Sequence, residues 1–187
     1  AMSEGGEMSH SGVQVEYVSA GSVSSVYPAS GVVTGGSMVT LSGTGFVSGR
    51  TACKFGSAMA VEATVVSSVE AVCVAPAGAR GSVVVEVATS WEGQVLAAGE
   101  LSASSKQYVY GSEVSVQSMM PSAVSVEGGS TLSVIANGLE DGAMAWCKQG
   151  TVLVQAPAVS MGVVQCVATA GIDGYTTVEV SANGQDF

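Results

Sequence analysis

The sequence repeats itself at an interval of 93 residues. Gly35-Gly36-Ser37 recurs as Gly128-Gly129-Ser130, and Val85-Glu86-Val87 recurs as Val178-Glu179-Val180. Three further pairs keep the register to within one residue: Pro28 with Pro121, Cys73 with Cys166, and Cys53 with Cys147 after a one-residue insertion. Self-similarity at a fixed interval indicates one structural unit used twice.

The choice of apolar residues predicts an all-β fold. The 187 residues include 34 Val but only 6 Leu and 2 Ile, together with 25 Gly. Val is stiff at χ1 and packs well on a pleated sheet, whereas Gly allows tight turns. We therefore expect short strands separated by glycine-rich turns, as in a β-sandwich. The expected strands cover residues 13–17, 37–42, 51–55, 60–66, 71–75, 82–88 and 130–135, and Asn183-Gly184 is a hairpin-turn signal.

The repeat divides the chain into three parts. Residues 1–21 are expected to be a leader plus the last strand of a preceding repeat, because Tyr17 lies as far before Pro28 as Tyr110 lies before Pro121. Residues 22–111 form the first domain and residues 112–187 the second. The second copy has no counterpart of residues 95–110, which predicts that it is truncated at its last strand; arbitrary fragment boundaries are the alternative explanation of the same ends.

Charge and apolar patterning each argue against one class of partner. Fifteen acidic and five basic residues leave a net charge of −10. Nucleic-acid binding needs clustered Lys and Arg, so we expect no nucleic acid as partner. No run of about 20 predominantly apolar residues occurs, which argues against direct membrane insertion of this stretch.

A run of motifs in the first copy resembles the IPT/TIG domain, an immunoglobulin-like β-sandwich. The run is, in order, Pro28, Gly35-Gly36, Gly43-Thr44-Gly45-Phe46, Cys53-Lys54-Phe55-Gly56, Val72-Cys73 and Pro76. The second copy is looser, with Ala136-Asn137-Gly138-Leu139 at the Gly-x-Gly-Phe position. The resemblance implies two tandem immunoglobulin-like sandwiches. It also implies the settings of that family: stalks of cell-surface receptors such as plexins, large surface or secreted proteins, Rel-type transcription factors, and accessory domains of starch-acting enzymes.

The four cysteines form one pair per copy. Cys53 and Cys73 are 20 residues apart, and Cys147 and Cys166 are 19 apart. Near-equal spacing at equivalent positions predicts the same intradomain disulfide twice, which would place the parent protein in an oxidising compartment. Four buried free thiols are the alternative. Zinc is disfavoured because there is no Cys-x-x-Cys and no pair of histidines.

No constellation of residues indicates catalysis or a cofactor. The single histidine, His10, lies in the Ser/Gly-rich leader and cannot complete a Ser-His-Asp triad. Glu140-Asp141 is better explained as a solvated turn than as an acid pair. Calcium needs clustered oxygen ligands, and Glu113 stands alone near the expected junction. We expect no enzyme activity, no metal and no cofactor.

The two tryptophans are the candidate aromatic contacts. Trp91 falls in an expected turn and is the possible ligand-contact residue, although a turn tryptophan that partly plugs the core is the simpler interpretation. Trp146 adjoins Cys147, where packing of the ring on the disulfide is expected.

Three functional hypotheses follow. The first is a non-enzymatic extracellular module of a larger cell-surface or secreted protein, serving as spacer, adhesion or protein-interaction unit beside neighbouring repeats of its parent chain. The second is a glycan- or matrix-binding module that uses Trp91 and the long connection at residues 95–107. The third is self-association by strand exchange, in which residues 12–18 of one molecule fill an open sheet edge of another.

Overall fold

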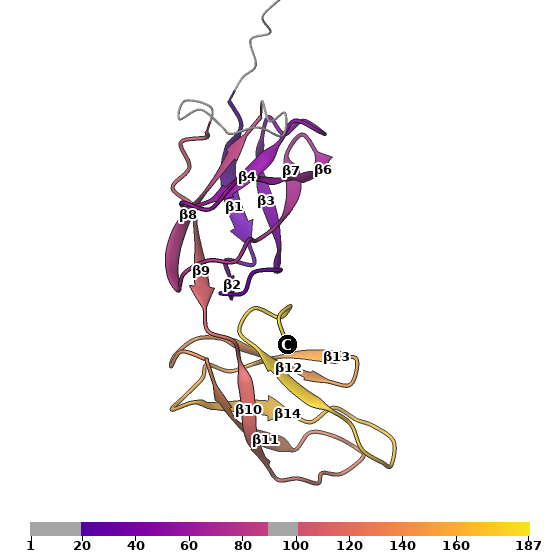
Figure 1. Cartoon of the computed structure of the whole chain (residues 1–187). Coiled ribbons are helices and arrows are strands. Elements are labelled where there is room, and N and C mark those ends of the chain that lie inside the picture. The colour runs from indigo at the N-terminus through magenta and orange to yellow at the C-terminus, as the bar shows by residue number, and fades with distance from the viewer. Residues whose placement is uncertain (1–19, 90–100) are drawn as a thin grey trace, which may run out of the picture.

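The computed structural model describes residues 20–89 and 101–187 and contains only strands, turns and loops within them. The strands gather into two units that lie end to end, with β9 of the first running directly into the second (Figure 1). We call them unit 1, which holds β1–β9, and unit 2, which holds β10–β15. The all-β, immunoglobulin-like fold predicted from composition and motifs is confirmed.

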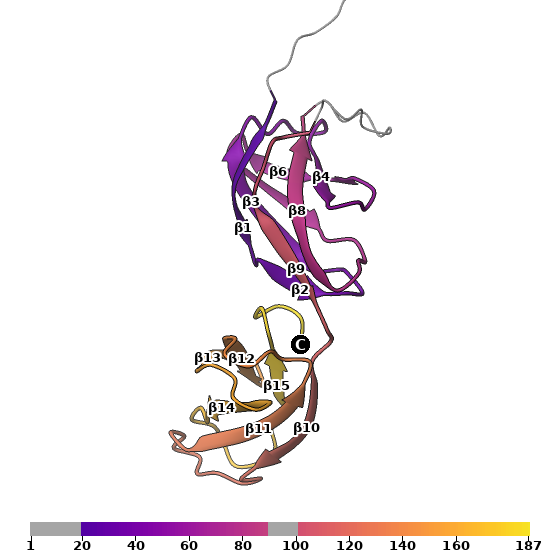
Figure 2. The ribbon, with the colours of Figure 1, turned by 90° about the vertical axis from the view of Figure 1, so that its left-hand side faces the viewer.

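Unit 1 is a sandwich of a four-stranded and a five-stranded sheet, ordered β1-β3-β7-β6 and β2-β9-β8-β4-β5. All strand pairs are antiparallel except β2 with β9. Figure 2 shows the two layers edge-on. The strands are β1 (Ser22–Tyr27), β2 (Ser30–Val32), β3 (Met38–Thr44), β4 (Ala52–Phe55), β5 (Val61–Glu62), β6 (Thr64–Ser67), β7 (Glu70–Val74), β8 (Gly81–Ala88) and β9 (Gln107–Gly111).

The core of unit 1 lies between the two sheets and contains a cluster of aromatic rings. Val39 and Leu41 of β3 face Val85 and Val87 of β8, and all four are fully buried. Strand β9 adds Tyr108 and Tyr110. The Tyr108 ring packs edge-on against Phe55 at 5.3 Å and against Tyr110 at 5.1 Å, a geometry that aromatic pairs favour.

Unit 2 has two three-stranded sheets, ordered β10-β11-β14 and β13-β12-β15. Its core is smaller and aliphatic, built from residues such as Leu132, Val134, Val164 and Val180. Strand β15 pairs with β12 on one side, and no strand of the described residues pairs with its other side. The strands are β10 (Ser115–Met120), β11 (Thr131–Asn137), β12 (Ala145–Gln149), β13 (Val152–Ala156), β14 (Val163–Val167) and β15 (Val178–Ser181).

The 93-residue register of the sequence is kept in the backbone. The β1–β3 ladder has a bulge between Val23 and Ser25, and the β10–β11 ladder has its bulge between Val116 and Ser118. At one equivalent interior position the polarity changes, because Phe55 of unit 1 is replaced by Gln149. The Gln149 amide donates to the Val167 carbonyl at 2.7 Å and accepts from the Thr169 amide at 2.9 Å.

Two of the local predictions were wrong. The stretch 60–66 was expected to be one strand but forms β5 and β6, because the chain changes sheets at the buried Ala63, whose amide donates to the Thr51 carbonyl at 2.9 Å. Asn183-Gly184 forms a turn, but residues 182–187 contain no returning strand. The strand expected at 13–17 lies outside the described residues.

Candidate functional site: the joint between the two units

The contacts between the two units join residues that lie far apart in the sequence. In Figures 1 and 2 the C-terminal residues lie between unit 1 and unit 2. They follow β15 and comprise residues 182–187. We call the stretch 183–186 the joint turn, and we call the contacts that it makes with unit 1 the joint.

The joint turn is shaped by its own side chains. The Ser181 hydroxyl accepts hydrogen bonds from the amides of Asn183 and Gly184 at 3.2 and 3.0 Å. The Asn183 side-chain oxygen accepts from the amides of Gln185 and Asp186, both at 3.0 Å. Asn favours such turns because its short side chain can bond to backbone two or three residues further on. Gly184 has φ of +79°, which a residue with a side chain rarely adopts.

Two polar side chains of the joint turn reach unit 1. The Asn183 side-chain nitrogen donates to the Ser30 carbonyl at 2.9 Å and to an Asp186 carboxylate oxygen at 2.7 Å. The same Asp186 oxygen accepts from the Ser37 hydroxyl at 2.6 Å. Ser37 is buried, so this is a charge-assisted hydrogen bond that is largely shielded from water.

Two further polar pairs lie at the exposed rim of the joint. The Thr34 hydroxyl donates to Glu113 at 3.2 Å, and Arg80 forms an ion pair with Glu140 at 3.3 Å. Both members of the ion pair are largely exposed, and exposed pairs contribute about 0–1 kcal/mol. The rim pairs are thus weaker than the part-buried Asp186–Ser37 hydrogen bond.

Burial perturbs the tyrosines beside the joint. Burial raises the pKa of the Tyr108 hydroxyl above 10.0; the nearby Ser37 hydroxyl opposes this shift, and the negative charge of Asp186 adds to it. Burial also raises the pKa of Tyr110, whose hydroxyl donates to the Pro76 carbonyl at 2.8 Å. Both tyrosines are therefore neutral at physiological pH and act as structural groups.

A cavity of about 130 Å³ lies between the two units. Its lining includes Ser30 and Val109 of unit 1 and Glu140 and Asn183 of unit 2. Typical ligand pockets enclose about 300–1,000 Å³. The cavity at the joint is therefore smaller than a typical small-molecule pocket.

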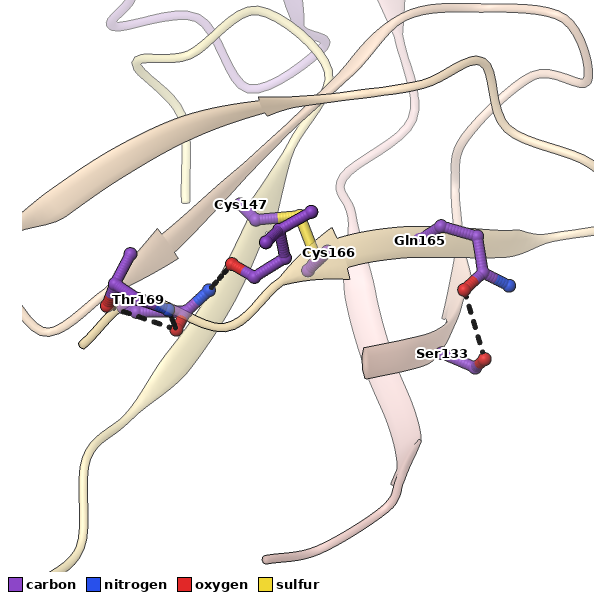
Figure 3. The surroundings of a disulfide bond; sticks show 7 residues. Ser133, Cys147, Gln165, Cys166 and Thr169 are labelled. Carbon is purple, nitrogen blue, oxygen red and sulfur yellow. Dashed lines mark hydrogen bonds between the residues drawn. A yellow bond between two sulfur atoms is a disulfide. The ribbon is translucent and has the colours of Figure 1, made fainter. Parts of the chain in front are cut away.

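The four cysteines form two disulfides, each of which ties one sheet of a sandwich to the other. Cys53 of β4 is bonded to Cys73 of β7, with the Cα atoms 6.4 Å apart. Cys147 of β12 is bonded to Cys166 of β14, with the Cα atoms 5.9 Å apart (Figure 3). No cysteine in the structure is free.

The other candidate residues from the sequence are placed as follows. Trp91 lies outside the described residues. Trp146 does not pack on the disulfide as expected: neighbours on a strand point to opposite faces, and its ring lies against Gly184 of the joint turn. Glu113 and Glu140 belong to the rim of the joint, and within residues 20–89 and 101–187 no group of three metal-ligating side chains occurs.

Sequence reasoning identified the Asn183-Gly184 turn but missed the joint. The contacts of Asn183 and Asp186 with unit 1 span about 150 residues of chain. Ser37 was assigned only to a strand. The only local indication of this contact in the sequence was a cluster of polar residues next to a glycine: Asn183, Gln185 and Asp186.

Comparison with known proteins assigns the family of unit 1. Residues 22–103 match the model of the IPT/TIG domain. Residues 22–103 form an IPT/TIG domain. A search of curated protein sequences gave no match. IPT/TIG domains are in general non-catalytic structural or interaction modules.

The fold resembles that of solved IPT/TIG-containing structures. Two structures of the full extracellular region of plexin A4 align at 16% identity, with TM-scores of 0.58 and 0.54, over 96% and 87% of this chain. The chain spans only 16–17% of their length. SGBP-B from a xyloglucan utilization locus of Bacteroides uniformis aligns at 15% identity over 89% of this chain and 47% of its own, with a TM-score of 0.34 that is too low to indicate a shared fold.

In the part of the chain that the structure covers, no helix is long and apolar enough to cross a membrane.

Proposed function

We propose that the chain is a non-enzymatic, extracellular pair of IPT/TIG domains within a larger cell-surface or secreted protein, where it acts as a spacer and as an adhesion or protein-interaction module. Unit 2 is, in this proposal, a second IPT/TIG domain, because its bulge, its disulfide position and its Gly-Gly turn keep the 93-residue register of unit 1. The domain boundaries we propose are residues 22–111 and 112–187.

The observation that carries the proposal is the joint. A spacer fixes the distance and orientation between the domains at its two ends. It can do so only if its own units keep a fixed orientation relative to each other. Unit contacts within a chain are otherwise mobile by default. The Asp186–Ser37 and Asn183–Ser30 hydrogen bonds, together with a linker that passes from β9 to β10 in a few residues, hold the two sandwiches in one arrangement.

The extracellular location is supported by the two disulfides. Disulfides persist in oxidising compartments and are rare where glutathione keeps thiols reduced. The partner we propose is a protein or a glycan at a cell surface or in a matrix, and no nucleic acid. Trp91 remains the candidate contact residue on sequence grounds.

A peptide map of native material under non-reducing conditions tests the location. Free thiols are blocked before digestion, and the cross-linked peptides are then identified by mass. The expected result is Cys53 linked to Cys73 and Cys147 linked to Cys166. Four blocked free thiols would contradict an extracellular role and would favour an intracellular scaffold.

A further inference from the structure

Both asparagines of the chain are followed by glycine. They are Asn137, which precedes Gly138 at the end of β11, and Asn183, which precedes Gly184 in the joint turn. A following glycine favours spontaneous loss of the asparagine amide, because it has no side chain to hinder the approach of its own backbone nitrogen. The surroundings of the two sites differ: Asn137 is exposed, whereas Asn183 is only 8% exposed.

The reaction needs no reagent except water. The backbone nitrogen of Gly184 attacks the side-chain carbonyl carbon of Asn183, and a new carbon–nitrogen bond closes a five-membered imide. The side-chain nitrogen of Asn183 leaves as ammonia, which takes up the proton that the Gly184 amide has lost. Water then adds to one of the two imide carbonyl carbons and opens the ring. The product carries a carboxylate at position 183, as aspartate or as its backbone isomer.

The joint holds both reacting groups in hydrogen bonds. The attacking amide of Gly184 donates to the hydroxyl of Ser181, a fully buried residue, at 3.0 Å. The departing nitrogen of Asn183 donates to the Ser30 carbonyl and to the Asp186 carboxylate. Ring closure requires the Gly184 amide to lose its proton and the Asn183 side chain to turn toward it, and both changes break these bonds. The reaction rate therefore follows the population in which the joint turn is open.

Conversion of the Asn183 amide to a carboxylate would prevent the joint from closing again. The side-chain nitrogen lies 2.9 Å from the Ser30 carbonyl oxygen and 2.7 Å from an Asp186 carboxylate oxygen. A carboxylate at this place would set a negative charge against one acceptor and one like charge, and a poorly solvated charge without a partner is costly. The aspartate product keeps the oxygen that accepts from the Gln185 and Asp186 amides, so the turn itself would remain.

We propose that Asn183-Gly184 is a deamidation site that the closed joint protects, and that its modification releases unit 2 from unit 1. Opening of the joint exposes the site to reaction, and the carboxylate then blocks closure, so a transient opening becomes a permanent one. This inference goes beyond the spacer role. It requires only that the joint is closed in the unmodified chain.

Rates of deamidation at the two asparagines test the protection. The full chain is incubated near neutral pH, folded and in concentrated urea, and the peptides that contain Asn183 and Asn137 are followed by mass spectrometry. We expect Asn183 to react at least about tenfold more slowly in the folded chain than in urea. Ser37→Ala removes the bond to Asp186 and should raise the folded-state rate at Asn183 at least about tenfold, with no change at Asn137.

The control variant for these rates is Ser130→Ala. Ser130 is the equivalent of Ser37 in the 93-residue register and belongs to unit 2, outside the joint, so both rates should stay unchanged. Circular dichroism of each variant establishes that it is folded. Protection by the joint is contradicted if Asn183 reacts as fast in the folded chain as in urea. It is also contradicted if Ser37→Ala accelerates Asn137 as much as Asn183.

Residual dipolar couplings of an Asn183→Asp variant test the release. The unmodified chain is expected to fit one alignment tensor, and Asn183→Asp is expected to need separate tensors for unit 1 and unit 2. The matched control is Gln185→Glu, which makes the same amide-to-carboxylate change at an exposed residue of the joint turn and should keep one tensor. A single tensor for Asn183→Asp overturns this inference alone. Two tensors already in the unmodified chain overturn the spacer proposal as well.

Discussion

Asn183 donates a hydrogen bond to the backbone carbonyl of Ser30, which lies 153 residues earlier in the chain, at 2.9 Å. The bond links the turn after the last strand of unit 2 to the second strand of unit 1. Its neighbour Asp186 adds the bond to Ser37. One short polar turn of unit 2 thus bonds to two positions of unit 1.

Removal of the part-buried hydrogen bond between Ser37 and Asp186 should destabilise the chain. Ser37→Ala removes the donor to Asp186, and a hydrogen bond to a charged group contributes about 1.5–3 kcal/mol to the free energy of unfolding. Asp186→Ala removes the same bond, so the double variant should cost less than the sum of the single variants. Urea unfolding of the three variants measures this. The control is Ser24→Ala, an exposed serine bonded within unit 1. If the loss in the double variant equals the sum of the losses in the two single variants, a direct bond between Ser37 and Asp186 is contradicted.

Addition of a methyl group at Gly31 should destabilise unit 1. The Cβ atom of Gly31→Ala would collide with the buried hydroxyls of Tyr108 and Ser37, and overpacking of a well-packed interior costs about 1–3 kcal/mol. Tyr108→Phe removes one of the two hydroxyls, so the double variant should recover part of the loss. Chemical denaturation measures both effects. Equal losses with and without the Tyr108 hydroxyl would show that the two groups do not share this space.

The stability of unit 1 should fall at alkaline pH. Burial raises the folded-state pKa of Tyr108 and Tyr110 above 10.0. A group whose pKa is raised by folding stabilises the protein fully below its unfolded pKa and loses that contribution as the pH rises through the folded pKa. Guanidinium unfolding measured between about pH 9 and pH 12 should therefore show that the free energy of unfolding falls ever more steeply as the pH rises.

The variant Tyr108→Phe/Tyr110→Phe serves as the control for the pH series. It has lost the Tyr110 bond to Pro76, so it should be less stable at neutral pH, but its stability should depend less on pH above about pH 10. An identical pH dependence in both proteins would assign the alkaline loss to other groups.

Each disulfide should stabilise its own unit by a similar amount. The loops that the bridges close are 20 and 19 residues in separation, and a loop of this size is worth about 3 kcal/mol in the chain-entropy account. Cys53→Ala/Cys73→Ala should lower the unfolding free energy of unit 1, and Cys147→Ala/Cys166→Ala that of unit 2. Trp146 fluorescence follows unit 2. A loss below about 1 kcal/mol in either unit would contradict this account.

The sequence placed five of the fifteen strands of the described residues closely, because these five depend on local patterns. Alternating Val residues and Gly-Gly turns placed β3, β4, β7, β8 and β11 to within one or two residues. The stretch 60–66 failed because both β5 and β6 continue the same alternation, and the change of sheet at Ala63 depends on a contact with Thr51. Periodicity does not reveal which partner strand a segment chooses.

The joint could not be predicted either, because it also depends on contacts between segments that are distant in the sequence. Asn183 and Gly184 were recognised as a turn from their backbone preferences, but the bonds to Ser30 and Ser37 depend on how two folded units meet. The replacement of Gly31 by Val124 is visible in the repeat. That Gly31 leaves space for the Tyr108 hydroxyl is visible only in the structure.

The relative orientation of the two units in solution tests the central claim most directly. Residual dipolar couplings of backbone amides in a weakly aligned sample report the alignment of unit 1 and unit 2 separately. A joint that holds both units in one orientation predicts that a single alignment tensor fits the couplings of both. Two tensors of clearly different magnitude would show that the units move independently, and would contradict the rigid spacer.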